Sequence, residues 1–219
     1  YQYNIPSFRY NWQNTLSYNK TFGQHKINAV VGYEAQKTNS RYFFVHGTNL
    51  SNPFFGVNEN LIGSTLTNQF IGGSFSQRAF TSTFGRVSYS LMDRYLMTAT
   101  LRNDKISSLP HGNQNATLPG FSLGWRLSEE DFFKKLDPQG IVSELKVRGG
   151  WAKVGNVEIG SYPYAGLFSA AQYGDWSGIR FSQAGNGALS FETSKKLNFG
   201  VDVSLWANRV SLSAEYFKN

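Results

Sequence analysis

Polar and apolar residues alternate along much of the chain. In residues 7–19 (SFRYNWQNTLSYN), every odd position is polar, and five of the six even positions carry an aromatic or aliphatic side chain. A period of two residues is typical of a β-strand whose two faces meet different surroundings. The same alternation predicts eight strands in all, over residues 7–19, 26–36, 83–90, 95–102, 117–127, 145–153, 197–205 and 209–217.

The connections between these strands are alternately short and long. The short ones are TFGQH (21–25), LMD (91–93) and ANR (207–209), and each is short enough for a tight antiparallel hairpin. The long ones cover roughly residues 45–78, 103–116 and 156–190. This alternation places every long connection at the same end of the sheet. Outer-membrane barrels have that asymmetry, with short periplasmic turns and longer extracellular loops.

One connection, SEEDFFKKL (128–136), predicts a short helix on the periplasmic side. Ser128 is the expected N-cap and Asp131 closes a capping box, while acidic residues occupy the first turn and lysines the last. The acids Glu129, Glu130 and Asp131 could instead form a metal or acid–base site, but helix capping accounts for all of them.

Period two alone fits both a soluble β-sandwich and a membrane barrel. The aromatic residues favour the barrel, because they fall near both ends of the predicted strands and flank a band of aliphatic residues, as aromatic girdles do. Those near the short turns are Tyr18, Tyr89, Tyr95, Trp125 and Trp206, and those towards the other end are Tyr10, Trp12, Tyr33 and Trp151. Strands of 9 to 11 residues can also cross a bilayer at a tilt. We therefore expect an all-β fold, an antiparallel transmembrane β-barrel segment.

Composition excludes several other classes. No run of about 18 apolar residues occurs, so the chain has no transmembrane helix, and its start (YQYNIPS) has no secretory signal, so the amino terminus is expected to be mature or truncated. Without cysteine, the chain has no disulfides, thiolate metal sites or cysteine nucleophiles. The net charge of +7 suits nucleic-acid binding, but the basic residues are dispersed and form no run longer than a doublet. We therefore expect no nucleic-acid partner.

Four segments resemble consecutive barrel segments of the SusC/RagA-like TonB-linked outer membrane proteins, which are TonB-dependent receptors. They are FGRVSYSLMDRYLMTATLRND (84–104), LPGFSLGWRLSEEDFFK (118–134), LKVRGGWAKVGN (145–156) and LSFETSKKLNFGVDVSLWANRVSLSAEYF (189–217). The similarity runs in order from about residue 8 to the last residue. It departs after LRND (101–104), where KISSLPHGN stands in place of the family's Gly-Ser-Ser-rich turn.

The resemblance implies the rest of the expected architecture and function. Transporters of this class close with about 22 strands, so residues 1–219 would be part of one larger barrel domain, with the plug domain and the TonB box absent from this chain. The resemblance further implies the outer membrane of a Gram-negative bacterium, contact with its lipid, and TonB-dependent import of a glycan, oligosaccharide or peptide. TonB and a SusD-like surface lipoprotein are the implied partners. No enzymatic activity, cofactor or metal is expected.

The best candidate for ligand contact is AAQYGDWSGIR (170–180), within a long predicted extracellular loop. Tyr173 and Trp176 would stack on a sugar ring or pack a peptide side chain, while Asp175 and Arg180 would form hydrogen bonds to it. Alternatively, these aromatics pack the loop onto its neighbours. A second aromatic stretch, NPFFGVNENL (52–61), is expected to serve loop packing.

Catalysis has little support in the sequence. His25, His46 and His111 have no partner at metal-ligand or catalytic-triad spacing, and GNG (185–187) is typical of a turn rather than a phosphate-binding loop. Three alternatives to the importer stay open. They are a self-contained small outer-membrane barrel with an adhesive or structural role, an outer-membrane barrel enzyme, and a soluble β-sandwich that binds carbohydrate.

Overall fold

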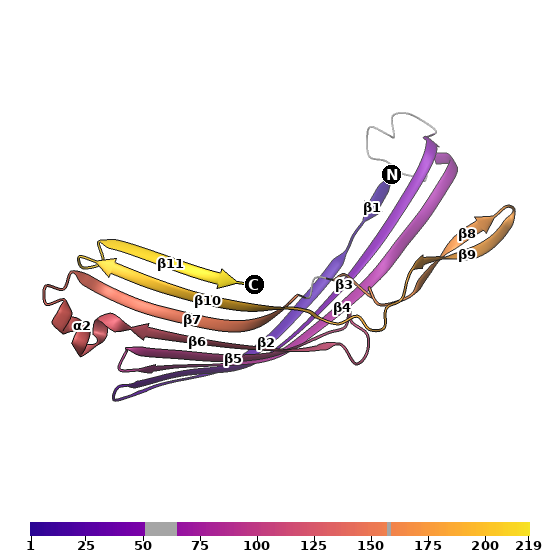
Figure 1. The fold of residues 1–219 in the computed structure, drawn as a ribbon. Helices are drawn as coiled ribbons and strands as arrows, with labels where there is room; N and C mark the ends of the chain where they lie inside the picture. Colours follow the sequence, from indigo (N-terminus) through magenta and orange to yellow (C-terminus); the bar gives the residue numbers. More distant parts are fainter. Residues whose placement is uncertain (51–64, 157–158) are drawn as a thin grey trace. The chain divides into compact units, whose positions relative to one another are not determined.

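The computed structural model describes residues 1–50, 65–156 and 159–219, which are mostly antiparallel strands (Figure 1). One sheet contains β1 (Gln2–Asn4), β2 (Ser7–Phe22), β3 (His25–Leu50), β4 (Thr65–Leu91), β5 (Tyr95–Ile106), β6 (Asn115–Arg126), β7 (Val142–Asn156), β10 (Glu192–Leu205) and β11 (Val210–Lys218). A separate hairpin contains β8 (Leu167–Tyr173) and β9 (Trp176–Gln183). All eight predicted strands coincide with strands of the large sheet, apart from the end residues Leu127 and Arg209, so the predicted all-β antiparallel fold is confirmed.

Most strands pair with their neighbours along the chain. The sheet order is β1-β3-β4-β5-β6-β7-β10-β11, with β2 also paired to β3. Within the described residues β11 pairs only with β10, so the sheet is open at that edge. The described residues form two compact units, residues 1–11 with 36–79 and residues 12–35 with 80–219. The second unit carries most of the sheet and the hairpin β8–β9.

The smaller unit is held together by aromatic contacts and strand pairing. β1 runs antiparallel to β3, with Tyr3 opposite Phe44. The rings of Tyr1 and Phe44 stack at a centroid distance of 5.7 Å, and the guanidinium of Arg41 lies 5.8 Å from the centroid of Phe75. Gly72 leaves room for the ring of Phe44, since a Cβ at this position would collide with it.

The short connections of the larger unit all lie at one end of the sheet, here called the turn-side end; the opposite end is the loop-side end. The connections after β2, β4, β6 and β10 are adjacent, because backbone hydrogen bonds link them. Met92 donates to the carbonyl of Gln24 at 2.7 Å, and Trp206 donates to the carbonyl of Ile141 at 2.8 Å. The predicted sorting of short connections to a single end is thus confirmed.

The long connections contain more structure than predicted. The expectation of a loop over residues 45–78 is wrong at both of its ends, because β3 continues to Leu50 and β4 begins at Thr65. The consecutive apolar residues of β3 and the glycines of β4 obscure the alternation there. The connection predicted over 103–116 is also shorter, because β5 ends at Ile106 and β6 begins at Asn115. The link 156–190 contains the hairpin β8–β9.

The predicted helix begins later than expected, and its predicted cap is wrong. Residues Leu127–Glu129 form a 3₁₀ turn, η2, and the helix α2 covers Asp131–Leu136 with Glu130 at the N-cap. Neither element has a side-chain cap hydrogen bond, and Ser128 is buried. The carboxylate of Glu130 instead accepts hydrogen bonds from Trp125 of β6 and from Arg94 in the turn before β5. Among the described residues, no helix is long and apolar enough to cross a membrane.

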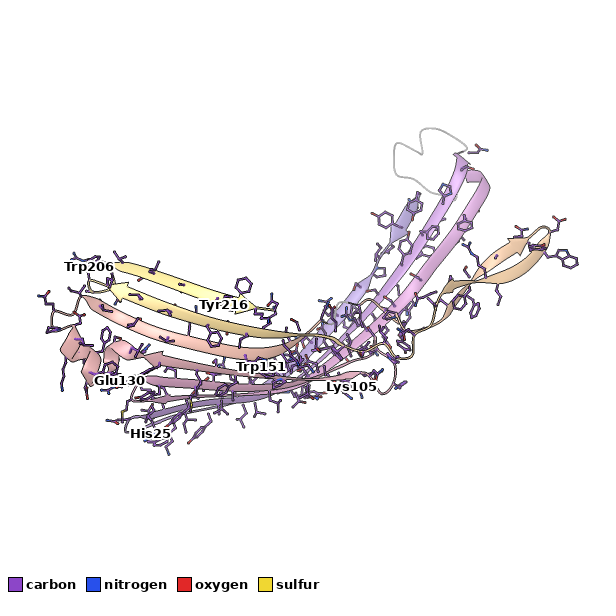
Figure 2. The ribbon with its side chains drawn as sticks, viewed as in Figure 1. His25, Lys105, Glu130, Trp151, Trp206 and Tyr216 are labelled. Carbon is purple, nitrogen blue, oxygen red and sulfur yellow. The ribbon has the colours of Figure 1, made fainter. Side chains whose placement is uncertain are left out.

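The strand registers give the sheet two chemically different faces. Directly opposed residues share a face, so the row of Ala99, Phe121, Trp151 and Leu197 and the row of Met97, Leu123 and Phe199 form one face. This is the apolar face. The intervening rows form the polar face, which carries Thr98, Ser122, Gly150 and Asn198, and then Arg126, Lys146, Asp202 and Ser213. Figure 2 shows side chains projecting from both sides of these strands, with Trp151 and Tyr216 of the apolar face labelled.

The apolar face is not covered by any described residue. Leu123 is 48% exposed, and Phe121, Trp151 and Phe199 are exposed as well. Most of the aromatic residues expected near the strand ends are also exposed, except Tyr89, whose hydroxyl lies 2.7 Å from Nδ1 of His25. A continuous apolar surface of this extent marks contact with another apolar phase or partner.

Candidate functional site

A network of charged side chains crosses the polar face of β7, β10 and β11. Nε of Arg148 donates to Asp202 at 3.1 Å, and the two terminal nitrogens of its guanidinium donate to the carboxylate of Glu215 at 3.3 and 3.2 Å. Asp202 also accepts a 2.6 Å hydrogen bond from Ser213, and Glu215 accepts one of 3.0 Å from Asn198. The planar guanidinium thereby joins two carboxylates from two strands.

Gly200 makes this network possible. It lies between Arg148 and Glu215 in the cross-strand registers and is buried. A Cβ at this position would lie 2.9 Å from the central carbon of the guanidinium of Arg148. Since β10 carries no side chain there, Arg148 of β7 reaches across it to Glu215 of β11.

A second cluster surrounds Arg102 on the polar face of β5. Its guanidinium forms salt bridges with Asp104 at 2.6 Å and with Glu34 at 3.6 Å. It also lies 5.7 and 5.6 Å from the ring centroids of Phe80 and Phe84, at distances typical of cation–π contact. Asp104 is itself buried.

A shallow hollow of about 560 Å³ lies on the polar face of the sheet, between these two clusters. Its lining includes Thr98, Thr100, Ser122, Lys196 and Asn198. Gly150 leaves room in the hollow for the side chain of Asn198. A Cβ at position 150 would lie 2.7 Å from the side-chain oxygen of Asn198. The hydroxyl, amide and ammonium groups can be hydrated and can face a polar solute, while Phe217, the cross-strand partner of Asn198, adds an aromatic ring to the same hollow.

The turn-side end is fixed by ion pairs outside the strands. The carboxylate of Glu130 accepts a 3.0 Å hydrogen bond from the indole of Trp125 and one of 3.2 Å from Arg94. The hydrogen bond from Trp125, then that from the hydroxyl of Tyr95 and the charge of Arg94, lower the pKa of Glu130 below its usual value. In the neighbouring turn, the ammonium of Lys26 lowers the pKa of Asp93 through hydrogen bonds of 2.8 and 2.6 Å.

The structure brings the predicted ligand-contact residues together on the hairpin β8–β9. Tyr173 and Trp176 are directly opposed across the turn, and Arg180 lies on the same face of β9 as Trp176. Asp175 is in the turn itself, after Gly174, whose φ of +59° permits the tight reversal. Tyr173 is 87% exposed and Trp176 is 79% exposed, so neither ring packs onto neighbouring described elements. Nε of Arg180 donates to Ser169 at 3.3 Å.

The other sequence candidates lie apart from one another. No group of three or more histidine, cysteine, aspartate or glutamate side chains suited to a metal occurs in residues 1–50, 65–156 and 159–219. His46 lies on β3 beside Tyr1, and His111 lies in the β5–β6 connection. The stretch NPFFGVNENL (52–61) lies outside the described residues.

Sequence reasoning missed the two charge clusters of the polar face, which surround Arg148 and Arg102. Their members are far apart in the chain, and only the register shows which ones meet. A usable signal was present, because Lys146 and Arg148 occupy alternate positions of one strand and Asp202 occupies the matching phase of another. Opposite charges in the same phase of neighbouring strands form cross-strand pairs.

Comparison with known proteins matches the whole chain to one family. The family model described as "TonB dependent receptor-like, beta-barrel" matches residues 1–219. "TonB-dependent receptor P3" of Formosa agariphila is 32% identical over 213 residues, which are 94% of this chain and 20% of that protein. "TonB-dependent receptor SusC" of Bacteroides thetaiotaomicron is 29% identical over 221 residues, 94% of this chain and 21% of that protein. The chain thus spans about a fifth of the length of these curated relatives.

The solved structures agree on the fold. The structure described as the RagAB peptide transporter superposes with a TM-score of 0.84 at 21% identity, over 98% of this chain and 24% of that one. The siderophore receptor PiuA from Acinetobacter baumannii superposes with a TM-score of 0.55 at 13% identity, over 98% of this chain and 32% of that one. At these identities the likeness concerns the fold alone.

Proposed function

Because the chain belongs to the family of TonB-dependent receptor-like β-barrels, we propose that it forms part of the wall of an outer-membrane transporter that imports a nutrient. Energy for import would reach the transporter through TonB. The relatives are about five times as long as this chain, so the plug domain and the TonB-contacting segment would belong to other parts of the protein. The role proposed for residues 1–219 is to supply barrel strands and extracellular loops.

The observation that carries this proposal is the two-faced sheet. Its apolar face is exposed, and its polar face carries paired charges and a wettable hollow. A transmembrane barrel requires this division, with apolar residues towards lipid and polar residues towards the lumen. The described strands form one large sheet rather than two sheets packed face to face, which favours the barrel over the soluble sandwich.

The cargo we propose is a large nutrient of the glycan or peptide class. One similar structure is that of a peptide transporter, and the family that the sequence resembles includes glycan importers, so both classes remain within the proposal. Tyr173 and Trp176 offer two exposed rings on one face of the hairpin, with Arg180 on the same face. Rings beside a few polar groups suit either a sugar or a peptide side chain. A SusD-like surface lipoprotein is the proposed partner on the extracellular side.

The proposal is tested by uptake in the native host. Labelled oligosaccharide and peptide mixtures are supplied to the parent strain, to a strain lacking this gene, and to a strain lacking TonB. We expect one mixture to accumulate in the parent only, and complementation with the full-length gene to restore uptake. Equal accumulation in all three strains, for both mixtures, would refute import through this protein.

A further inference from the structure

Two lysines oppose each other on the apolar face at its loop-side end. Lys153 of β7 and Lys195 of β10 are direct cross-strand partners. The next pair towards the turn-side end on the same face is Trp151 with Leu197. Lys195 is exposed and Lys153 is half-buried. Two ammonium groups therefore stand at the edge of a largely aromatic and aliphatic surface, and Lys218 of β11, the cross-strand partner of Leu197, adds a third in the next row.

Neither lysine has an acidic partner among the described residues, unlike four basic residues of the polar face. Arg102, Arg126, Lys146 and Arg148 each form a salt bridge with a carboxylate. No such bridge includes Lys153 or Lys195 in the part of the chain that the structure describes. Like charges directly opposite each other destabilise a strand pair. An anion from outside the chain would relieve that repulsion.

The depth of the pair follows from the strand geometry. Ser143 marks the turn-side boundary of β7, because its hydroxyl accepts a 3.2 Å hydrogen bond from Asn208 in the turn that contains Trp206. From Ser143 to Lys153, a rise of about 3.4 Å per residue along a strand tilted by about 40° gives roughly 26 Å. The apolar band of a transmembrane barrel is about 25 Å tall. In a barrel whose apolar band begins at Ser143, Lys153 and Lys195 would therefore lie where the lipid headgroups begin.

We propose that Lys153 and Lys195 bind the phosphate headgroup of an outer-leaflet lipid, with its acyl chains along Trp151 and Leu197. Direct cross-strand partners have Cα atoms about 4.5–5.5 Å apart, so two flexible ammonium groups can approach one phosphate and donate charge-assisted hydrogen bonds to it. Anionic headgroups attract lysines at a membrane surface in this way. This inference rests on the membrane placement that the proposed function requires, but it assigns a site outside the transport path.

The experiment uses the full-length protein in detergent and three chemically matched probes. Dimyristoyl phosphatidic acid carries both phosphate and acyl chains, dimyristoylglycerol lacks the phosphate, and inorganic phosphate lacks the chains. Native mass spectrometry measures how much of each probe the protein retains. The test variant is Lys153→Gln/Lys195→Gln. The control is Lys196→Gln, because this neighbour of Lys195 lies on the polar face and lines the hollow.

We expect the wild-type protein and the control to retain phosphatidic acid, and the double variant to retain it roughly thirtyfold less, about fivefold for each lysine. Dimyristoylglycerol should bind weakly and equally to all three proteins. Equal retention of phosphatidic acid by the wild-type protein and the double variant would overturn the proposal, and so would an equal loss in the control. Binding of inorganic phosphate as tight as that of phosphatidic acid would overturn the lipid as the ligand.

Uptake measured in parallel separates this inference from the proposed function. Neither lysine lies on the polar face, so the double variant should import cargo as the wild-type protein does. Absence of gene-dependent uptake in the wild-type strain would refute the transport proposal while leaving the lipid measurement interpretable. Equal retention of phosphatidic acid by the wild-type protein and the double variant, with normal uptake in both, would refute only the lysine site.

Discussion

Placing a charge at Leu123 measures which solvent the apolar face meets. Leu123 of β6 pairs with Gly149 of β7, about midway between Ser143 and Lys153, and is therefore close to the centre of the proposed apolar band. An arginine on the lipid face costs about 2–4 kcal/mol at the bilayer midplane. We expect Leu123→Arg to lower the folded-to-unfolded ratio roughly 30- to 800-fold.

Ser122→Arg is the matched control, one residue away on the opposite face. Ser122 lines the hollow of about 560 Å³, which leaves space for the longer side chain in contact with water. Surface substitutions of this kind change stability by about 0.5 kcal/mol or less. The assay is denaturant unfolding of the full-length protein reconstituted in phosphatidylcholine vesicles, followed by tryptophan fluorescence. Equal destabilisation by both variants, or a larger loss with Ser122→Arg, would refute the assignment of the two faces.

Three further predictions concern the hairpin, the β5–β6 connection and the turn-side end. Trp176→Ala should weaken cargo binding about tenfold through loss of ring stacking, as measured by calorimetry. The control Trp206→Ala, at the turn-side end, should leave cargo binding unchanged. Equal effects of the two variants would contradict cargo contact by Trp176. Ile106→Ala removes a side chain that is 0% exposed and should lower the local free energy of unfolding by about 2–5 kcal/mol. Amide hydrogen exchange in residues 107–114 should then be at least thirtyfold faster. Unchanged exchange would contradict the packing role of Ile106. Because the pKa of Glu130 is lowered in the fold, its stabilising contribution is present above its unfolded pKa of about 4.3 and is lost as the pH falls through the lower folded value. A pH series of thermal melts should therefore show a larger acid loss of stability in the wild-type protein than in Glu130→Gln, in which Asp93 still contributes; equal losses would contradict this role of Glu130.

The sequence predicted the strands well where one face alone is apolar. Residues 197–205 alternate strictly, and β10 covers them. The extension of β3 and β4 was missed, because Tyr42 to Val45 are consecutive apolar residues and Gly72 and Gly73 are typical of breaks. In the structure Gly72 instead admits the ring of Phe44. Local pattern cannot distinguish a glycine that ends a strand from one that accommodates a neighbouring side chain.

The helix cap shows how tertiary contacts override a local motif. Ser128 and Asp131 have the spacing of a capping box, yet the carboxylate of Glu130 bonds to Trp125 and Arg94. These donors come from β6 and from the turn before β5, and nothing in the nine-residue motif identifies them. The capping role predicted for Ser128 was wrong, and the partners of Glu130 required the fold.

The candidate contacts of the hairpin could be predicted as a group, whereas the faces of the basic residues could not. Tyr173, Asp175 and Trp176 are neighbours in sequence, so any turn there brings them together. In the sequence, the doublet Lys195/Lys196 shows two adjacent charges and no difference between them. The register separates it, with Lys195 on the apolar face opposite Lys153 and Lys196 on the polar face. Only the pairing of β7 with β10 reveals that difference.

The central claim is that the polar face of this chain lines a path for import. Since the chain contains no cysteine, Lys196→Cys and Leu197→Cys provide adjacent labelling sites on opposite faces. In cells producing the full-length protein, a bulky, membrane-impermeant maleimide should react at position 196 and reduce cargo uptake, whereas position 197 should stay unlabelled and uptake should be unchanged. Complete labelling at position 196 with undiminished uptake would contradict the account.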